Sequence, residues 1–106
     1  MATYVHAQSN PSAATSTTLY TNPGGVTTVL SGVTVANRSN VGTTFRVSID
    51  PAAAGDSNED YYAYDMPIGG NESVVVAQGA IVPSTGLVRV YATLATLSFQ
   101  GDGVEI

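Results

Sequence analysis

The sequence predicts an all-β fold, an antiparallel β-sandwich or jelly roll of about seven to nine short strands. Leu, Glu, Lys and Arg, which favour helices, are sparse, whereas Thr, Val, Ser and Gly fill the chain. Apolar and polar residues alternate over several short segments, and clusters of Gly, Pro and Asn separate these segments. Strands and turns at this spacing are typical of sandwiches and jelly rolls.

The clearest strand spans Thr43–Asp50, where Phe45, Val47 and Ile49 fall on one face and polar side chains on the other. Similar alternation predicts further strands, in chain order, at Thr3–Gln8, Thr17–Thr21, Val26–Leu30, Val33–Asn37, Tyr61–Ile68, Ser73–Gln78, Leu87–Thr93, Ala95–Gln100 and Val104–Ile106. The third and fourth of these are alternatively one strand that is bulged at Ser31-Gly32. Turns are predicted between the strands, at residues 22–25, 37–40, 51–58, 69–71, 83–86 and 101–103.

A chain of 106 residues fits one domain, so we expect residues 1–106 to form a single β-sandwich. The segment SNPSAATSTT, residues 9–18, is predicted to be an arm that is mobile or ordered by a partner. A sandwich of this size leaves open sheet edges, and the absence of lysine removes the usual edge protection. We therefore expect the chain to form oligomers.

The charge and composition argue against several classes of partner. The net charge is −5, with three arginines and no lysine, so the chain lacks the basic stripe that a nucleic-acid binder needs. No apolar run approaches a membrane span, and the N-terminus does not have the pattern of a cleaved signal, so we expect neither membrane insertion nor export. Without cysteine, neither a disulfide nor a thiolate metal site can form.

The acidic loop at residues 56–60 is the first candidate for a metal site. It opens with the alternating oxygen ligands of an EF-hand, but the required Gly and Glu are replaced by Tyr61 and Pro67. A looser calcium site formed by Asp56, Glu59 and Asp60 remains as a hypothesis, and the alternative is that these acids face water. No cofactor is otherwise expected.

Catalytic patterns are weak. His6 is the only histidine, so a zinc site would need three copies around a three-fold axis, and no Gly-x-Ser-x-Gly nucleophile motif occurs. A glycosidase would have to pair Asp65 with Glu72 or Asp60, in a chain that is small for a sugar cleft. The glycine pairs precede no helix and therefore do not predict a phosphate site. We expect no enzymatic activity and no catalytic residues.

The stretch from Tyr61 to Val76 is predicted to be two strands joined by a turn at Gly69, Gly70 and Asn71. If Tyr62, Tyr64 and Met66 line the core, then Tyr61 and Asp65 lie on the opposite face. Tyrosine is enriched where proteins bury one another, because it adds contact area and keeps a polar group. Tyr61, Asp65 and the turn are therefore candidate contacts with a partner, and the alternative is an ordinary aromatic core with one exposed ring.

Three segments together resemble small structural proteins of tailed bacteriophages: "QSNPSAATSTTLYTNPGG" near the start, "YYAYDMPIGGNESVVV" in the middle and "LVRVYATLATLSFQGDGVEI" at the end. The resemblance covers most of the chain and concerns a style of sequence, lysine-poor, cysteine-free and rich in Thr and Val. It implies a β-sandwich or jelly-roll protein that decorates the capsid as a cement protein, commonly as a trimer.

The partner implied by the resemblance is the major capsid protein or another virion protein, and the implied location is the outer capsid surface after synthesis in the host cytoplasm. Residues 9–18 and a free C-terminal strand with Val104 and Ile106 would add to a neighbour by β-augmentation. A tail, neck or baseplate adaptor is the alternative function. A receptor- or carbohydrate-binding module is the lower alternative, since Tyr61 could stack on a sugar but tryptophan is absent.

Overall fold

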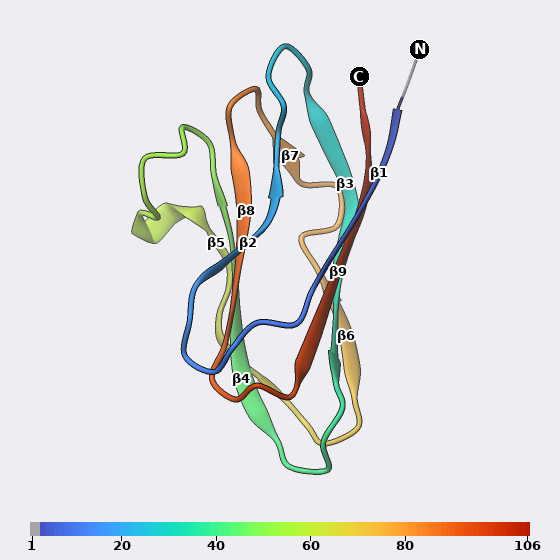
Figure 1. Ribbon diagram of the computed structural model, residues 1–106, viewed down its shortest axis with the longest axis vertical. Coiled ribbons are helices and arrows are strands. Elements are labelled where there is room, and N and C mark those ends of the chain that lie inside the picture. The colour runs from blue at the N-terminus through green and yellow to red at the C-terminus, as the bar shows by residue number, and fades with distance from the viewer. Residues whose placement is uncertain (1–2) are drawn as a thin grey trace.

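The computed structural model describes residues 3–106, which form nine β-strands and one short 3-10 turn (Figure 1). The strands are β1 (Thr3–Ser9), β2 (Thr17–Thr21), β3 (Thr28–Asn37), β4 (Thr43–Asp50), β5 (Tyr61–Ile68), β6 (Ser73–Val76), β7 (Ile81–Val82), β8 (Leu87–Ala92) and β9 (Leu97–Glu105). The 3-10 turn, η1, is Asn58–Asp60. No described residue belongs to a helix with the length and apolarity needed to cross a membrane.

The strands build two antiparallel sheets that face each other, as predicted (Figure 1). Sheet A has the order β1-β9-β3-β6, with the short β7 also paired to β3, and sheet B has the order β2-β8-β4-β5. The pairs are nested: β1 pairs with β9, β2 with β8, β3 with β6, and β4 with β5. A long antiparallel ribbon that is rolled up gives this nesting, which is the jelly-roll arrangement.

The core lies between the two sheets. Phe45, Val47 and Ile49 point into it from β4, which confirms the alternation predicted for that strand. Phe45 meets Phe99 of β9 edge to face, with ring centroids 6.2 Å apart, so an aromatic contact joins the two sheets. Burial of each such side chain stabilises the fold by roughly 1.5–3 kcal/mol.

The bulge predicted within β3 is present. The register of β3 against β9 shifts between Leu30 and Gly32, so Ser31 is the extra residue in one continuous strand. The predicted turn at residues 101–103 is wrong, because β9 runs through these residues without a break. At Gly103 a Cβ atom would lie 2.5 Å from the carbonyl oxygen of Val29, so this glycine permits close approach of neighbouring strands and does not mark a turn.

β5 and β6 are two strands joined by a turn, as predicted, but they do not form a hairpin. The turn at residues 69–71 carries the chain from sheet B to sheet A, and the two strands pair with β4 and β3 instead of with each other. Gly70 lies so close to the loop before β4 that a Cβ atom would be 2.3 Å from the carbonyl oxygen of Asn40. Asn71 has a positive φ of 58° and donates its N–H to the carbonyl oxygen of Ser39. The turn therefore closes one end of the sandwich.

The core face predicted for β5 is wrong as well. Tyr62 and Tyr64 are 52% and 58% exposed, whereas Ala63 is buried. Register shifts against β4 on either side of Val47 insert extra residues into β5, and these bulges change which side chains face the core. Ile68 is buried, since the alternation resumes after the second bulge.

Residues 9–18 connect the two sheets. Ser9 ends β1, Thr17 begins β2, Pro11 between them is buried, and Ala14 donates its N–H to the carbonyl oxygen of Ala92. The mobility of this segment stays a prediction. Residues 3–106 share the one core between the sheets, and residues 1–2 of the predicted domain lie outside the described residues.

Candidate interaction surface

The outer face of sheet B carries a stack of aromatic rings around Arg46. The guanidinium carbon of Arg46, at the centre of β4, lies 4.3 Å from the ring centroid of Tyr64 on β5 and 4.5 Å from that of Tyr91 on β8. Tyr61 packs its ring edge to face against Tyr64, with centroids 4.8 Å apart. Neighbouring strands thus hold three rings and one cation in a fixed arrangement, stabilised by cation–π attraction.

A bulge in β5 completes this arrangement. Phe45 pairs with Met66 and Val47 with Ala63, so both Tyr64 and Asp65 lie opposite Arg46. Asp65 has a φ of 50°, which turns its carboxylate to the outer face beside Tyr64. Its Oδ1 accepts a hydrogen bond of 2.7 Å from Nε of Arg46. This hydrogen bond is the main cause that raises the pKa of Arg46.

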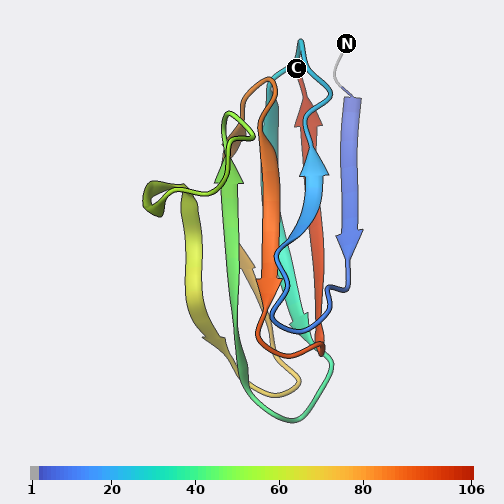
Figure 2. The same ribbon diagram turned by 60° about the vertical axis from the view of Figure 1, so that its left-hand side comes forward.

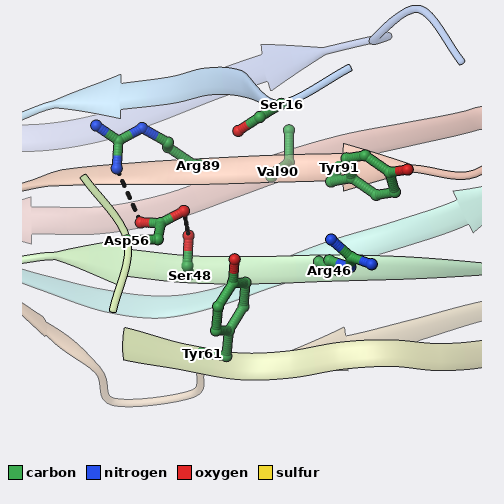
Figure 3. Close-up of a pocket in the computed structure, with 8 residues that line it drawn as sticks. All are labelled: Ser16, Arg46, Ser48, Asp56, Tyr61, Arg89, Val90 and Tyr91. Carbon is green, nitrogen blue, oxygen red and sulfur yellow. Dashed lines mark hydrogen bonds and ion pairs between the residues drawn. The ribbon is translucent and has the colours of Figure 1, made fainter. Parts of the chain in front are cut away.

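A second cluster lies at the end of β4, where Arg89 of β8 binds two carboxylates. Its guanidinium donates a hydrogen bond of 2.8 Å to Asp50. It donates another of 2.8 Å to Asp56, which also accepts one of 2.9 Å from the hydroxyl of Ser48 (Figure 3). Asp50 and Ser48 are 2% and 1% exposed although they lie on the polar face of the strand. The loop after β4 folds back and covers them.

Asp50 holds this loop in place. Burial by itself would raise the pKa of Asp50, but hydrogen bonds from Arg89 and from the backbone N–H groups of Gly55, Ala54 and Ala52 outweigh it and lower the pKa to about 2. The shortest backbone contact is 2.7 Å, from Gly55. The carboxylate is therefore charged at neutral pH and fixes both the loop and Arg89.

A depression separates the two clusters on the outer face of sheet B. Its lining residues are Ser16, Arg46, Ser48, Asp56, Tyr61, Arg89, Val90 and Tyr91 (Figure 3). Its volume is about 40 Å³, whereas pockets for small organic ligands measure roughly 300–1,000 Å³. The charged groups around it are hydrogen-bonded to one another. The face is thus suited to contact with another surface and not to enclosing a substrate.

The structure does not bring the three proposed calcium ligands together. Asp56 binds Arg89 and Ser48, Asp60 accepts the backbone N–H of Ser57, and Glu59 is exposed. Across residues 3–106, no three histidine, aspartate or glutamate side chains are grouped closely enough to hold a metal ion.

The histidine and the other carboxylates that could take part in chemistry have partners within the chain. His6 lies on β1 and its ring Nδ1 is 2.5 Å from the Asp102 carboxylate on β9. Glu72 accepts the backbone N–H of Gly69 and so stabilises the turn, while Asp65 is occupied by Arg46. Both carboxylates are thus hydrogen-bonded within the chain, one to a side chain of sheet B and the other to the backbone of the turn.

The predicted interface residues do not form one patch. Tyr61 and Asp65 lie together on the outer face of sheet B, as part of the stack around Arg46. Gly69, Gly70 and Asn71 lie in the turn between the sheets, where Gly70 and Asn71 are occupied with internal packing. Their role in partner binding stays a prediction.

The C-terminal strand is not free, contrary to expectation. Val104 pairs with both Tyr4 of β1 and Val29 of β3, and Ile106 exchanges two backbone hydrogen bonds with Thr27. The backbone of Ile106 is thus paired, whereas the residue as a whole is 68% exposed through its side chain. β-Augmentation through this strand is therefore blocked by its own neighbours.

Sequence reasoning missed the residues at the centre of the site: Arg46, Tyr64, Tyr91, Arg89, Asp50 and Ser48. The alternation of β4 did place Arg46 on the polar face, which was the one available signal. Tyr91 and Tyr64 lie beside Arg46 because β8 and β5 flank β4 in the sheet. Local sequence patterns do not predict this strand order.

The comparisons with known proteins leave the family open. No protein-family profile matches the chain, and no curated protein matches it. Among solved structures, a chain of the cyanophage Pam1 capsid asymmetric unit is similar, with a TM-score of 0.47 and 16% sequence identity, over 98% of this chain and 82% of that chain. A likeness this weak carries no argument about what this chain does.

Proposed function

We propose that this chain is a structural protein of a tailed-bacteriophage virion, which decorates the assembled capsid and cements it, and that it is not an enzyme. The observation that carries the proposal is the rigid stack of Arg46, Tyr61, Tyr64 and Tyr91 on an open face with only a shallow depression beside it. Tyrosine and arginine dominate the binding energy of protein interfaces. The sequence resemblance to small virion proteins points to the major capsid protein as partner.

The stack suits such a role because its geometry exists before binding. Arg46 is held by Asp65 and by two rings, so little side-chain entropy remains to be lost when a partner covers it. Each copy that binds the assembled lattice, and not the free capsid subunits, stabilises the lattice by mass action. Many weak, identical contacts on the outer capsid surface then stabilise the capsid together.

Cosedimentation with purified capsids that lack this protein tests the proposal. We expect the wild-type chain to bind, and Tyr64→Ala to weaken binding at least tenfold, which is about 1.4 kcal/mol or more for an interface tyrosine. Thr18→Ala, at an exposed position of β2 on the same sheet, serves as the control and should bind normally. Absence of the protein from purified particles, or no binding by the wild type, would refute the proposal.

An adaptor of the tail, neck or baseplate is the second candidate within the virion. Quantification of copy number in purified particles separates the two roles, since decoration requires hundreds of copies and an adaptor only a few. The exposed tyrosine rings next to Arg46 and Asp65 also favour a carbohydrate-binding module, because sugars stack on aromatic faces and bond to charged groups. A glycan screen without any binding would remove that candidate.

A further inference from the structure

The edges of the two sheets differ in how they are protected against pairing with another chain. β5 contains Pro67 and two register shifts, β2 has a shift between Thr18 and Tyr20, and β6 and β7 span only four and two residues. β1 has seven residues in unbroken register with β9 and contains no proline, lysine, arginine, aspartate or glutamate. Long, regular edges without charge are templates for strand pairing.

The outer side of β1 is uncovered within the described chain. Figure 2 shows β1 as the outermost strand of sheet A, and among residues 3–106 only β9 pairs with it. β2, the strand of sheet B that contacts β1, pairs with β8 and leaves the backbone of β1 unpaired on that side.

The hydrogen-bond pattern identifies the free groups of β1. Ile106 exchanges both backbone hydrogen bonds with Thr27, on the β3 side of β9. In an antiparallel strand, the backbone N–H and C=O groups of successive residues are directed to opposite neighbouring strands. The N–H and C=O of Glu105 are therefore directed to β1, where Thr3 is the partner of Glu105. The same alternation directs the N–H and C=O groups of three residues of β1 away from the sheet: Tyr4, His6 and Gln8.

We infer that β1 pairs antiparallel with β1 of a second copy of this chain, around a two-fold axis at His6. In this register His6 faces His6 of the partner subunit, and Tyr4 faces Gln8 of the partner subunit. Each outward N–H then meets an outward C=O of the other copy, since the three free residues are symmetric about His6. The pairing joins the two five-stranded sheets into one continuous sheet.

A second copy is the occupant because the edge complements itself. Tyr4, near one end of β1, is 89% exposed, which leaves a large ring without a contact. At the other end lies an open depression of about 310 Å³, lined by Gln8, Ser9, Asn10, Ser98, Phe99 and Gln100. The antiparallel register places Tyr4 of each copy opposite Gln8 of the other, next to this depression.

The charge distribution permits the same contact. The chain carries a net charge of −5, so two copies repel one another in general. Within β1 and β9 the carboxylates are Asp102, which contacts the ring of His6, and Glu105, which accepts a hydrogen bond from Tyr20 of sheet B, so each has a partner within the chain. The inference is independent of the virion role, and it gives a two-fold contact where the sequence resemblance implied a trimer.

Cysteine cross-linking tests the register in a chain that has no cysteine of its own. We expect a disulfide when Tyr4→Cys is mixed with Gln8→Cys under oxidising conditions, since paired Cα atoms lie about 5.5 Å apart. Neither variant alone should cross-link, because two equivalent positions are offset by four residues, about 14 Å. Cross-links of each variant with itself, or none in the mixture, would overturn the inference.

The oligomeric state gives an independent test by light scattering or analytical ultracentrifugation. We expect the wild type to pair, and His6→Pro to stay a single copy, because it removes an outward N–H without removing a hydrogen bond to β9. Asp102→Asn, which replaces the carboxylate beside the His6 ring by an amide but keeps the backbone groups, is the control and should still pair. A wild-type chain that stays single at high concentration, or that pairs β1 only with a strand of another protein, would contradict the inference.

Discussion

The outer face of sheet B and the β1 edge of sheet A are built in opposite ways. On sheet B the two arginines of β4 and β8 are each bound to carboxylates, and the β5 edge is bulged and contains a proline. β1 has no such charges, no bulge and no proline, and it leaves Tyr4 almost entirely exposed. The charged groups of sheet B have partners within the chain, whereas β1 has backbone hydrogen-bonding groups without a partner in the described chain.

This difference indicates that the outer face of sheet B contributes mainly to folding stability and that the β1 edge contributes mainly to association between copies. Buried charges on sheet B must keep their partners, because an unpaired buried charge is costly. Open backbone groups on β1 are hydrated in the single copy, so changes there alter pairing more than folding.

Loss of the Asp50 carboxylate should give the largest effect. Asp50→Ala leaves the N–H of Gly55 without its buried acceptor and leaves Arg89 with Asp56 alone, and we expect a loss of about 3 kcal/mol in unfolding free energy. Asp65→Ala removes the other arginine partner, but the Asp65 side chain is 47% exposed against 3% for Asp50, so we expect about 1 kcal/mol or less. Denaturant unfolding measures both, and equal losses would contradict the division.

Acid should weaken the same site. The pKa of Asp50 is lowered from 3.8 to about 2 by folding, so its contribution is present above about pH 4 and is lost as the pH falls toward 2. The shift corresponds to about 2 kcal/mol. Unfolding curves between pH 5 and 2, roughly the range that linkage predicts, should therefore show a steeper loss for the wild type than for Asp50→Asn. Parallel losses in the two proteins would show that Asp50 does not titrate in this way.

Much of the fold could be predicted from local sequence patterns. The bounds of β2, β4 and β5 agree with the predicted strands, and the bulge in β3 was expected. The turn at residues 101–103 was predicted wrongly, because Gly103 permits close packing of neighbouring strands and does not mark a turn. β7 was missed, since two residues are too few to show alternation.

The candidate site was harder to predict because it depends on strand order. Tyr64, Arg46 and Tyr91 come from three strands whose neighbours are fixed only by the rolled topology. The bulges of β5 also broke the two-residue period, so the core face of Tyr62 and Tyr64 was assigned wrongly. Local alternation carries no information about either feature.

Replacement of Arg46 should have a smaller effect than replacement of Asp50. Arg46→Met keeps an unbranched apolar stem but removes the cation between Tyr64 and Tyr91, and we expect a loss of about 1 kcal/mol in unfolding free energy. The near-ultraviolet circular dichroism of the tyrosines should change as their packing loosens. A loss as large as that of Asp50→Ala would show that the exposed stack, and not the buried ion cluster, stabilises sheet B.

Tyr4→Ala should have the smallest effect on folding and a clear effect on pairing. Tyr4 is 89% exposed, so in dilute protein, where copies are separate, we expect unfolding free energy to change by about 0.5 kcal/mol or less. At concentrations where copies pair, its ring would cover the partner's depression near Gln8, so the dissociation constant of the pair should rise at least tenfold. Tyr91→Ala is the matched control: it removes a ring that packs on Arg46 and should weaken folding while leaving pairing unchanged. If both tyrosine variants changed folding alike and neither changed pairing, the β1 edge would be an ordinary solvated surface and the contrast between the two regions would be wrong.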